Sequence, residues 1–482
     1  MSIGTNASKE GKDTMTDTIN NTAQNPLATE PIGKLIAKFA IPAIISFLVS
    51  AIYNIVDQIF IGQGVGLLGN AATNVAFPLT TISTAIALLI GVGSASNFNL
   101  RLGEGHKDKA GHIAGTGITL MIAFGVTLAV VVIAFLDPLL MAFGSTPNVL
   151  PYAQTYTGIT TLGIPFIILT TGGSQLVRAD GSPGYSMACL LSGAILNTIL
   201  DPVLIFGANM GIAGGAIATV LGQILSAVMV ILYFRRFKTL KLTKKHLRPH
   251  WSYAKMIFTL GMAACFNQLA LTAVQITMNN TLTYYGGLSH YGSEIPLAVV
   301  GIITKVNILF LGFAIGVAQG CQPIVGFNYG ARNYERVKKT FSKATVIVLA
   351  ISIAAFLAFQ LFPRQIVSAF GEGSEDYFEF AERYFRIFML LTFANGMQPL
   401  ISNFFTSIGK ATRGILLSLT RQIIFLLPLI LIFPIFWGID GVMYAGPIAD
   451  GAAAILAVAL VIGELRNMEK RDPRNRVALG TA

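Results

Sequence analysis

The chain has 482 residues, of which 54% are hydrophobic and only 11% charged, and its mean hydropathy is +0.67. Soluble domains carry roughly 25% charged residues, so this composition excludes a soluble globular protein. The net charge of +11 does not indicate nucleic acid binding, because the basic residues lie beside the ends of apolar segments and not in one patch with interleaved aromatic residues. Apolar runs long enough to cross a bilayer recur from Leu35 to Gly463, so we expect the chain to lie in lipid.

Residues 1–33 are polar and rich in Thr, Asn and Lys. They lack the short apolar core and cleavage site of a signal peptide, and we expect a disordered tail. The cysteines Cys189, Cys265 and Cys321 fall inside apolar runs without the spacing of a metal site, so they are interpreted as small core residues. We expect no organic cofactor.

Twelve membrane-spanning helices are predicted, which makes the chain an all-α polytopic membrane protein. In the first half of the chain they cover residues 35–60, 71–98, 113–136, 154–177, 186–206 and 213–234. In the second half they cover residues 255–284, 296–322, 341–362, 379–405, 411–435 and 440–463. Because the number is even, both termini are expected on the same face of the membrane.

The distribution of Lys and Arg predicts which face that is. Nearly all of these residues lie in the terminal segments and the even-numbered loops; the exceptions are Arg364, Arg383 and Arg386 on the other face, and Lys305 and Arg421 within helices. Loops rich in Lys and Arg stay in the cytoplasm. We therefore expect both termini to be cytoplasmic.

The two halves of the chain also resemble each other. Gly103 in "NLRLGEGHKDKAGH" and Gly330 in "GFNYGARNYERVKK" are 227 residues apart, as are Gly211 in "GIAGGA" and Gly438 in "GIDGVM". Six helices per repeat predict parallel repeats, related by an axis along the membrane normal. We expect two pseudo-symmetric six-helix bundles around a central cavity, the arrangement of an alternating-access transporter.

The expected division of the chain follows from this repeat. It is a tail over 1–33, an N-lobe over 34–234, a basic cytoplasmic linker over 235–254, a C-lobe over 255–463 and a cytoplasmic tail over 464–482.

Two carboxylates are predicted at matched depth in the outer half of the N-lobe. Asp57 lies near the outer end of the first helix and Asp201 near the outer end of the fifth, with Asn197 one turn before it and Thr219 at a similar depth on the sixth. Two carboxylates in a low-dielectric pocket cannot both ionise cheaply, so the group is suited to hold H⁺, or Na⁺ with the same oxygens. The alternative is that each Asp only bridges helices. Pro42 predicts a kink in the first helix and a hinge role.

A second set of charges falls near the middle of C-lobe helices. Lys305, Arg421 and Asp450 are expected either to line the cavity as an ion-pair network or to lock three helices together. Gln275 and Asn279 on the seventh helix indicate a wet interior, although amides also join helices to one another.

Several motifs together resemble the multidrug and toxic compound extrusion (MATE) family over nearly all of residues 35–463. They are, in chain order, "VDQIFIGQ", "GEGHKDKA", "RADGSPGYSM", "LNTILDPVLIFG" and "GIAGGAIATVLGQ". Members of this family are antiporters that expel cationic, often aromatic drugs in exchange for H⁺ or Na⁺. The resemblance implies a secondary active multidrug exporter of a bacterial inner membrane, monomeric and without enzymatic activity, whose partners are drug-like cations and the bilayer.

The resemblance also implies residue roles. The family's coupling-ion residues map onto Asp57, Asn197, Asp201 and Thr219, and its helix bend maps onto Pro42. One branch of the family adds a Glu on the seventh helix and an Asp on the tenth. Here the seventh helix carries amides instead, and the acidic residues of the tenth lie at its outer end, so an ion site in the C-lobe is not expected.

Two other function classes compete with this interpretation. A lipid-linked oligosaccharide flippase of the wider superfamily remains an alternative, although its pyrophosphate needs a cavity rich in cations, and the predicted helices supply only Lys305 and Arg421. A membrane enzyme is disfavoured, since no nucleophile and base pair, metal-ligand cluster or phosphate loop is found.

Overall fold

The computed structural model describes residues 25–369 and 374–471, and all regular elements in these ranges are helical. The N-lobe follows the short α2 (Pro26–Thr29) and contains α3 (Ile32–Val65), α4 (Leu67–Gly103), α5 (Lys107–Ala134), α6 (Leu136–Ala142), α7 (Leu150–Thr161), α8 (Ile164–Ala179), α9 (Pro183–Pro202), the π-helix η1 (Val203–Gly207) and α10 (Gly211–Phe234).

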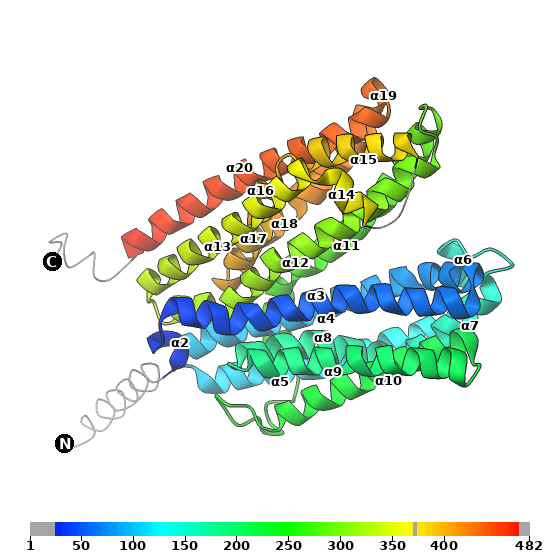
Figure 1. The fold of residues 1–482 in the computed structure, drawn as a ribbon. Coiled ribbons are helices and arrows are strands. Elements are labelled where there is room, and N and C mark those ends of the chain that lie inside the picture. The colour runs from blue at the N-terminus through cyan, green and yellow to red at the C-terminus, as the bar shows by residue number, and fades with distance from the viewer. Residues whose placement is uncertain (1–24, 370–373, 472–482) are drawn as a thin grey trace, which may run out of the picture.

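The C-lobe repeats this plan with more breaks. It contains α11 (Trp251–Gly287), α12 (Glu294–Gly330), α13 (Tyr334–Leu361), α14 (Pro363–Ser368), α15 (Glu375–Phe388), α16 (Thr392–Asn395), α17 (Met397–Ser407), α18 (Ala411–Leu419), the π-helix η2 (Thr420–Leu426), α19 (Leu427–Trp437) and α20 (Ile439–Arg471). Figure 1 shows the two lobes as two bundles, with both ends of the described chain at the same end of the molecule.

Two of the predicted continuous helices are broken. Within the described residues, ten helices are long and apolar enough to cross a bilayer, and the pair α7 and α8, bent by 52°, makes an eleventh. The span predicted over 379–405 is divided among α15, α16 and α17. Pro165 lies in the first turn of α8 and Pro399 in the first turn of α17, positions that tolerate the missing N–H of proline better than a helix interior does.

The repeat predicted from sequence is visible in the backbone at the same offset of 227 residues. Helix α6 begins at Leu136 and α14 at Pro363, while α7 ends at Thr161 and α15 at Phe388. Gly211, the first residue of α10, and Gly438, the residue just before α20, have matching positive φ angles of +55° and +56°. Each lobe therefore carries the same helix break and the same turn.

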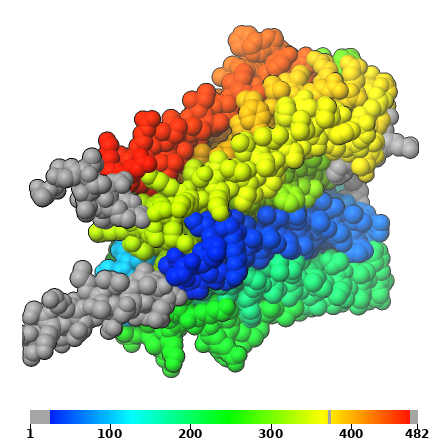
Figure 2. All heavy atoms as spheres, turned by 60° about the vertical axis from the view of Figure 1, so that its left-hand side comes forward, coloured from blue at the N-terminus to red at the C-terminus, as the bar shows by residue number. Residues whose placement is uncertain are grey.

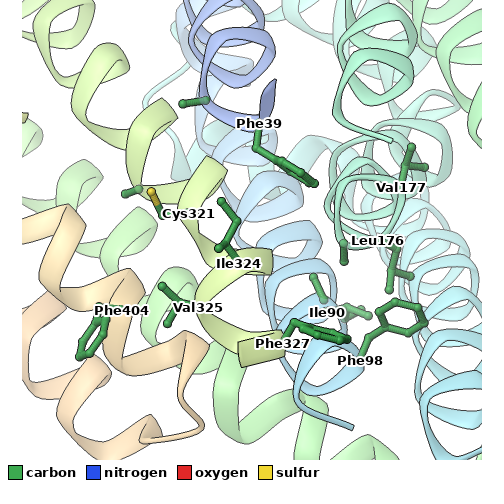
Figure 3. Close-up of a cluster of buried hydrophobic side chains, with 14 of the residues drawn as sticks. Phe39, Ile90, Phe98, Leu176, Val177, Cys321, Ile324, Val325, Phe327 and Phe404 are labelled. Carbon is green, nitrogen blue, oxygen red and sulfur yellow. The ribbon is translucent and has the colours of Figure 1, made fainter. Parts of the chain in front are cut away.

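The lobes are joined at the end of the molecule where α2 and the last turn of α20 lie, which we call the terminal face. They diverge toward the opposite end, the distal face, where α6 and α14 lie (Figure 1). One buried apolar cluster crosses between the lobes: Phe39, Phe98 and Leu176 of the N-lobe share it with Ile324 and Phe327 of the C-lobe (Figure 3). The C-lobe has a second apolar cluster of its own. The crossing cluster is what holds the terminal face closed.

Helices of opposite lobes approach closely along this seam. A Cβ atom on Gly320 of α12 would lie 2.6 Å from the Cα of Ala40 on α3, so only glycine fits there. The pair related to it by the repeat, α4 of the N-lobe and α11 of the C-lobe, is also packed together across the seam. In the space-filling view of Figure 2 the blue N-terminal stretch lies against the yellow-green part of the C-lobe.

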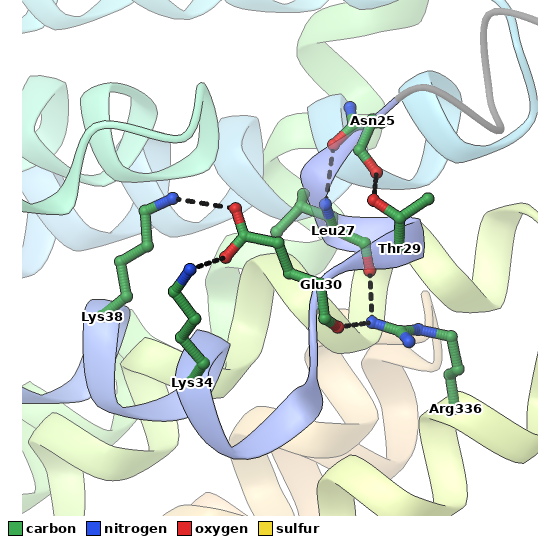
Figure 4. Close-up of polar contacts among 7 residues, drawn as sticks. All are labelled: Asn25, Leu27, Thr29, Glu30, Lys34, Lys38 and Arg336. Atoms are coloured by element: carbon green, nitrogen blue, oxygen red, sulfur yellow. Dashed lines mark hydrogen bonds and ion pairs between the residues drawn. The ribbon is translucent and has the colours of Figure 1, made fainter.

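The segment before α3 is ordered, which corrects the prediction of a disordered tail up to residue 33. Residues 1–24 lie outside the described residues, but α2 packs on the C-lobe. The guanidinium of Arg336 donates to the backbone oxygens of Leu27, at 3.1 Å, and Glu30, at 2.7 Å (Figure 4). Lys34 and Lys38 pair with the Glu30 carboxylate. The guanidinium of Arg336 therefore fixes the start of the N-lobe to the C-lobe.

The linker between the lobes is anchored to the terminal face. Asp180 accepts hydrogen bonds from the backbone N–H groups of Lys238, at 2.6 Å, and Thr239, at 3.1 Å, and from the hydroxyl of Tyr233 at 2.8 Å. His246 contacts the carboxylate of Asp108 at the start of α5 at 3.3 Å. The basic segment is therefore held against the N-lobe.

Candidate functional site

A cavity of about 510 Å³ lies between the lobes. Its N-lobe wall comes from α3, α4, α7, α8, α9 and α10, and its C-lobe wall from α11, α12 and α17. Apolar side chains alternate there with hydroxyl and amide groups, such as Thr171, Ser226 and Asn267. A cavity of this size that mixes apolar surface with a few polar groups suits a drug-sized organic molecule.

The four residues predicted for the ion site lie together at the N-lobe side of this cavity. The amide nitrogen of Asn197 lies 3.3 Å from Oδ1 of Asp201 and 3.3 Å from the hydroxyl of Thr219. Asp57 is 9% exposed, and its carboxyl group is within hydrogen-bonding reach of that of Asp201, which is fully buried. Asp57, Asn197 and Thr219 line the cavity, whereas the fully buried Asp201 is not one of its lining residues.

Three oxygens in this cluster are buried without a hydrogen-bond partner among the described residues: Oδ1 of Asp57, Oδ2 of Asp201 and Oδ1 of Asn197. Unsatisfied buried acceptors are expensive, and two facing carboxylates repel each other unless a proton or a cation lies between them. The cluster therefore has the donor atoms and the unmet charge of a site for H⁺ or Na⁺. Oxygen ligands of this kind suit Na⁺ as well as a proton.

Two tyrosines complete the cluster and were missed by the sequence analysis. Tyr53 is near both carboxylates, and the hydroxyl of Tyr156 reaches that of Thr219. Both tyrosines line the cavity. The position of Tyr53, one turn before Asp57 on α3, was a usable signal. Tyr156 is on α7, and nothing in its local sequence places it beside α10.

The C-lobe charges do not form the expected three-residue network. Nε of Arg421 donates to Oδ1 of Asp450, and the two residues are 5% and 4% exposed. Lys305 is exposed and makes no ion pair within the described residues. None of the three lines the cavity. Lys305 is therefore not part of the network, because its side chain lies outside the buried core that holds the other two.

Three further predicted residues, Gln275, Asn279 and Pro42, do not line the cavity. Gln275 donates to Asn279 at 3.0 Å along an exposed stretch of α11, and neither residue lines the cavity. Pro42 lies inside α3, which continues without a break on both sides of it; the hydroxyl of Ser46 donates to the Pro42 carbonyl at 2.8 Å. The hinge role of Pro42 stays a prediction.

Sequence comparison identifies relatives over most of the chain. The MatE family profile matches residues 42–203 and 264–432. The multidrug export protein MepA of Staphylococcus haemolyticus strain JCSC1435 is 26% identical over 441 residues, which cover 90% of this chain and 94% of that protein. MepA of Staphylococcus aureus strain MSSA476 is 25% identical over 432 residues, which cover 89% and 94%.

Solved structures share the fold at 23% sequence identity. A crystal structure of MATE in complex with MaD3S has a TM-score of 0.85 and covers 92% of this chain and 98% of its own. A structure described as the outward-facing conformation of a multidrug resistance MATE family transporter has a TM-score of 0.84 and covers 94% and 99%. With the family profile matching well over half of the residues, the chain belongs to the MatE family of multidrug efflux transporters and has its twelve-helix fold.

Proposed function

We propose that this protein is an antiporter that exports cationic, often aromatic small molecules and takes up H⁺, or Na⁺, in return. The observation that carries the proposal is the pair of facing carboxyl groups, Asp57 and Asp201, whose orphaned oxygens lie at the edge of a drug-sized cavity. Asn197 and Thr219 supply neutral ligands to the same group. The relatives named multidrug export proteins support the choice of substrate class.

The orientation proposed for the membrane places the terminal face in the cytoplasm. The support is the distribution of basic residues, since the linker over 235–250 and the α12 to α13 loop lie on that face with most of the Lys and Arg. With this orientation the lobes diverge toward the outside, so the form described here is closed to the cytoplasm.

Closure on the cytoplasmic side depends on polar bonds between the lobes as well as the apolar seam. Gln322 of α12 donates to Ser96 of α4 at 2.7 Å, and the amide of Asn97 donates to the Met256 carbonyl of α11 at 3.0 Å. An opening toward the cytoplasm requires these bonds to break. The free-energy difference between the form closed to the cytoplasm and a form open to it therefore depends on two regions. These are the contacts between the lobes at the terminal face and the ion site in the outer part of the N-lobe.

The exchange of drug for ion follows because both compete for the same negative charge. When the Asp57 and Asp201 pair has lost its proton, its charge favours a cationic drug in the cavity. A proton that arrives from outside neutralises the pair and weakens that attraction, so the drug is released. Because an ion can shift a conformational equilibrium only by binding its two states differently, occupancy of the pair must be linked to the opening of the lobes, directly or through α3.

The flippase alternative receives less support from the cavity. Arg178 is the one basic residue that lines it among the described residues. A pyrophosphate group needs several cations.

The experiment that tests the proposal is efflux of a fluorescent cation from proteoliposomes under separately imposed H⁺ and Na⁺ gradients. We expect wild-type protein to respond to at least one gradient and Asp57→Asn to respond to neither. Asp137→Asn is the matched control, because Asp137 is an exposed carboxylate that accepts from Gln154 at 2.7 Å outside the cavity. Gradient-driven efflux at the wild-type rate in Asp57→Asn would contradict the proposal.

A further inference from the structure

A buried cation without a counter-charge lies at the terminal end of the cavity. Arg178 is the second-last residue of α8, is 4% exposed and lines the cavity. Its Nη1 donates to Oε1 of Gln319, on α12 of the other lobe, at 2.5 Å and to Oε1 of Gln175 at 3.4 Å. Both partners are neutral amides. Nothing in the described chain supplies a carboxylate within ion-pair distance of the guanidinium.

This arrangement differs from that of two other buried charges, Arg421 and Glu464. Arg421 is paired with Asp450, and the fully buried carboxylate of Glu464 is paired with Lys410 and Arg413. Taking a charge out of water costs several kcal/mol unless a partner compensates. An uncompensated guanidinium therefore indicates that its counter-charge is not part of this chain.

Arg178 lines the cavity, and two of its three guanidinium nitrogens have no hydrogen-bond partner among the described residues. Both hydrogen bonds use Nη1, so the N–H groups of Nε and Nη2 have no partner in residues 25–369 and 374–471. These N–H groups form a planar fork that matches the two oxygens of a carboxylate. Gln175 and Gln319 hold the guanidinium plane from one side through their oxygens. The amide nitrogen of Gln175 in turn lies 3.5 Å from Oε1 of Gln319, which links the two amides to each other.

The two ends of the cavity thus have opposite character. The Asp57 group lies on the outer part of α3, whereas Arg178 lies at the end of α8 that approaches the terminal face. On α8 alone the lining extends from Ile164 to Arg178, about 21 Å of helix rise. A cation is attracted to the first end and repelled from the second.

We propose that Arg178, with Gln175 and Gln319, forms an anion subsite that binds the carboxylate of zwitterionic substrates, molecules that carry both an amine cation and a carboxylate. The proposal rests on the exporter function proposed above and assigns the residues that would contact the anionic group of such a substrate. When the terminal face opens, the bond from Arg178 to Gln319 must break because the two residues belong to different lobes. The guanidinium then meets the carboxylate of a substrate that enters from that side.

A matched pair of dyes tests the subsite. Rhodamine 110 carries a free carboxylate, and rhodamine 123 is its methyl ester, so the two differ in this charge and little else. Binding to purified protein in nanodiscs, followed by fluorescence polarisation without any ion gradient, should show that Arg178→Gln weakens rhodamine 110 about tenfold or more, the value of one lost charged hydrogen bond. Rhodamine 123 should change by less than about threefold, or bind more tightly. Arg178→Lys, which keeps the charge but loses the fork, should fall between.

A second measurement needs no variant and covers the case in which Arg178→Gln does not fold. At constant ionic strength, benzoate should displace rhodamine 110 from the wild-type protein at concentrations that leave rhodamine 123 bound. Equal losses of both dyes in Arg178→Gln, unchanged binding of both, or equal competition by benzoate would overturn the subsite. The absence of gradients separates this outcome from a failure of ion coupling, and a wild-type protein that binds neither dye would overturn the exporter function and the subsite together.

Discussion

The two lobes differ in how their intramembrane charges are paired. In the N-lobe, two like charges, Asp57 and Asp201, face each other with unsatisfied oxygens beside the cavity. In the C-lobe, Arg421 and Asp450 neutralise each other away from it. From the sequence, both sets were ionisable residues within apolar helices, and the C-lobe set was expected either to line the cavity or to lock helices together. The sign of the nearest partner and contact with the cavity, and not depth in the membrane, therefore separate an ion-exchange site from a structural ion pair.

The largest expected effect is on transport in the N-lobe cluster. Asp201→Asn should abolish gradient-driven efflux, because an amide cannot take up or release a proton. The same change should leave thermal stability unchanged or raised, since it removes repulsion between like charges. Efflux assays and thermal unfolding of the same purified variant measure both. Loss of folded protein together with loss of efflux would show that Asp201 has a structural role, like the C-lobe pair.

The reverse pattern is expected in the C-lobe. Asp450→Asn leaves Arg421 buried without a counter-charge and should destabilise the protein by about 3–5 kcal/mol, while transport per folded molecule stays near wild type. The double variant Arg421→Met with Asp450→Leu should recover most of that loss, because neither charge then remains buried. Thermal unfolding in detergent measures the cycle. If the double variant is as unstable as the single one, the pair is not the source of the stability.

An intermediate effect is expected for a neutral ligand of the cluster. Asn197→Ala removes one donor to Asp201 and one to Thr219 but keeps both carboxylates. Transport should continue at a reduced rate, with a shifted dependence on external pH. A complete loss of transport, as expected for Asp201→Asn, would show that Asn197 is essential for ion coupling.

The smallest effect is expected at Lys305, where the structure overturned the prediction from sequence. Its side chain is exposed and unpaired in the described residues, so Lys305→Ala should change stability by no more than about 0.5 kcal/mol. Thermal unfolding beside Asp450→Asn provides the comparison. A loss as large as that of Asp450→Asn would return Lys305 to the C-lobe network.

Sequence reasoning succeeded where a single helix period or the repeat carried the information. The matched depth of Asp57 and Asp201 followed from helix direction alone, and the structure brings them together with Asn197 and Thr219. The offset of 227 residues between Gly211 and Gly438 reappears in their backbone angles. Local patterns of this kind predict the folded arrangement because the membrane fixes the direction and the tilt range of each helix.

Sequence reasoning failed where contacts between distant segments decide whether a side chain is buried and what it pairs with. Lys305 and Arg421 fall at similar depth in their helices, and only packing shows that one is buried and the other exposed. Arg178 stands at a predicted helix end, where a cation is explained by topology, and its approach to Gln319 across the lobes has no local signal. The breaks before Pro165 and Pro399 were hidden because apolar composition continues through them.

Counting the ions displaced when a drug binds tests directly whether Asp57 and Asp201 hold the exchanged ion. Purified protein in weakly buffered solution is mixed with a cationic dye, and released H⁺ is followed with a pH indicator and released Na⁺ with an ion-selective electrode. We predict that wild type releases one of these ions on binding and that Asp57→Asn and Asp201→Asn release neither. Equal ion release by wild type and both variants would contradict it, because the exchanged ion would then come from another site.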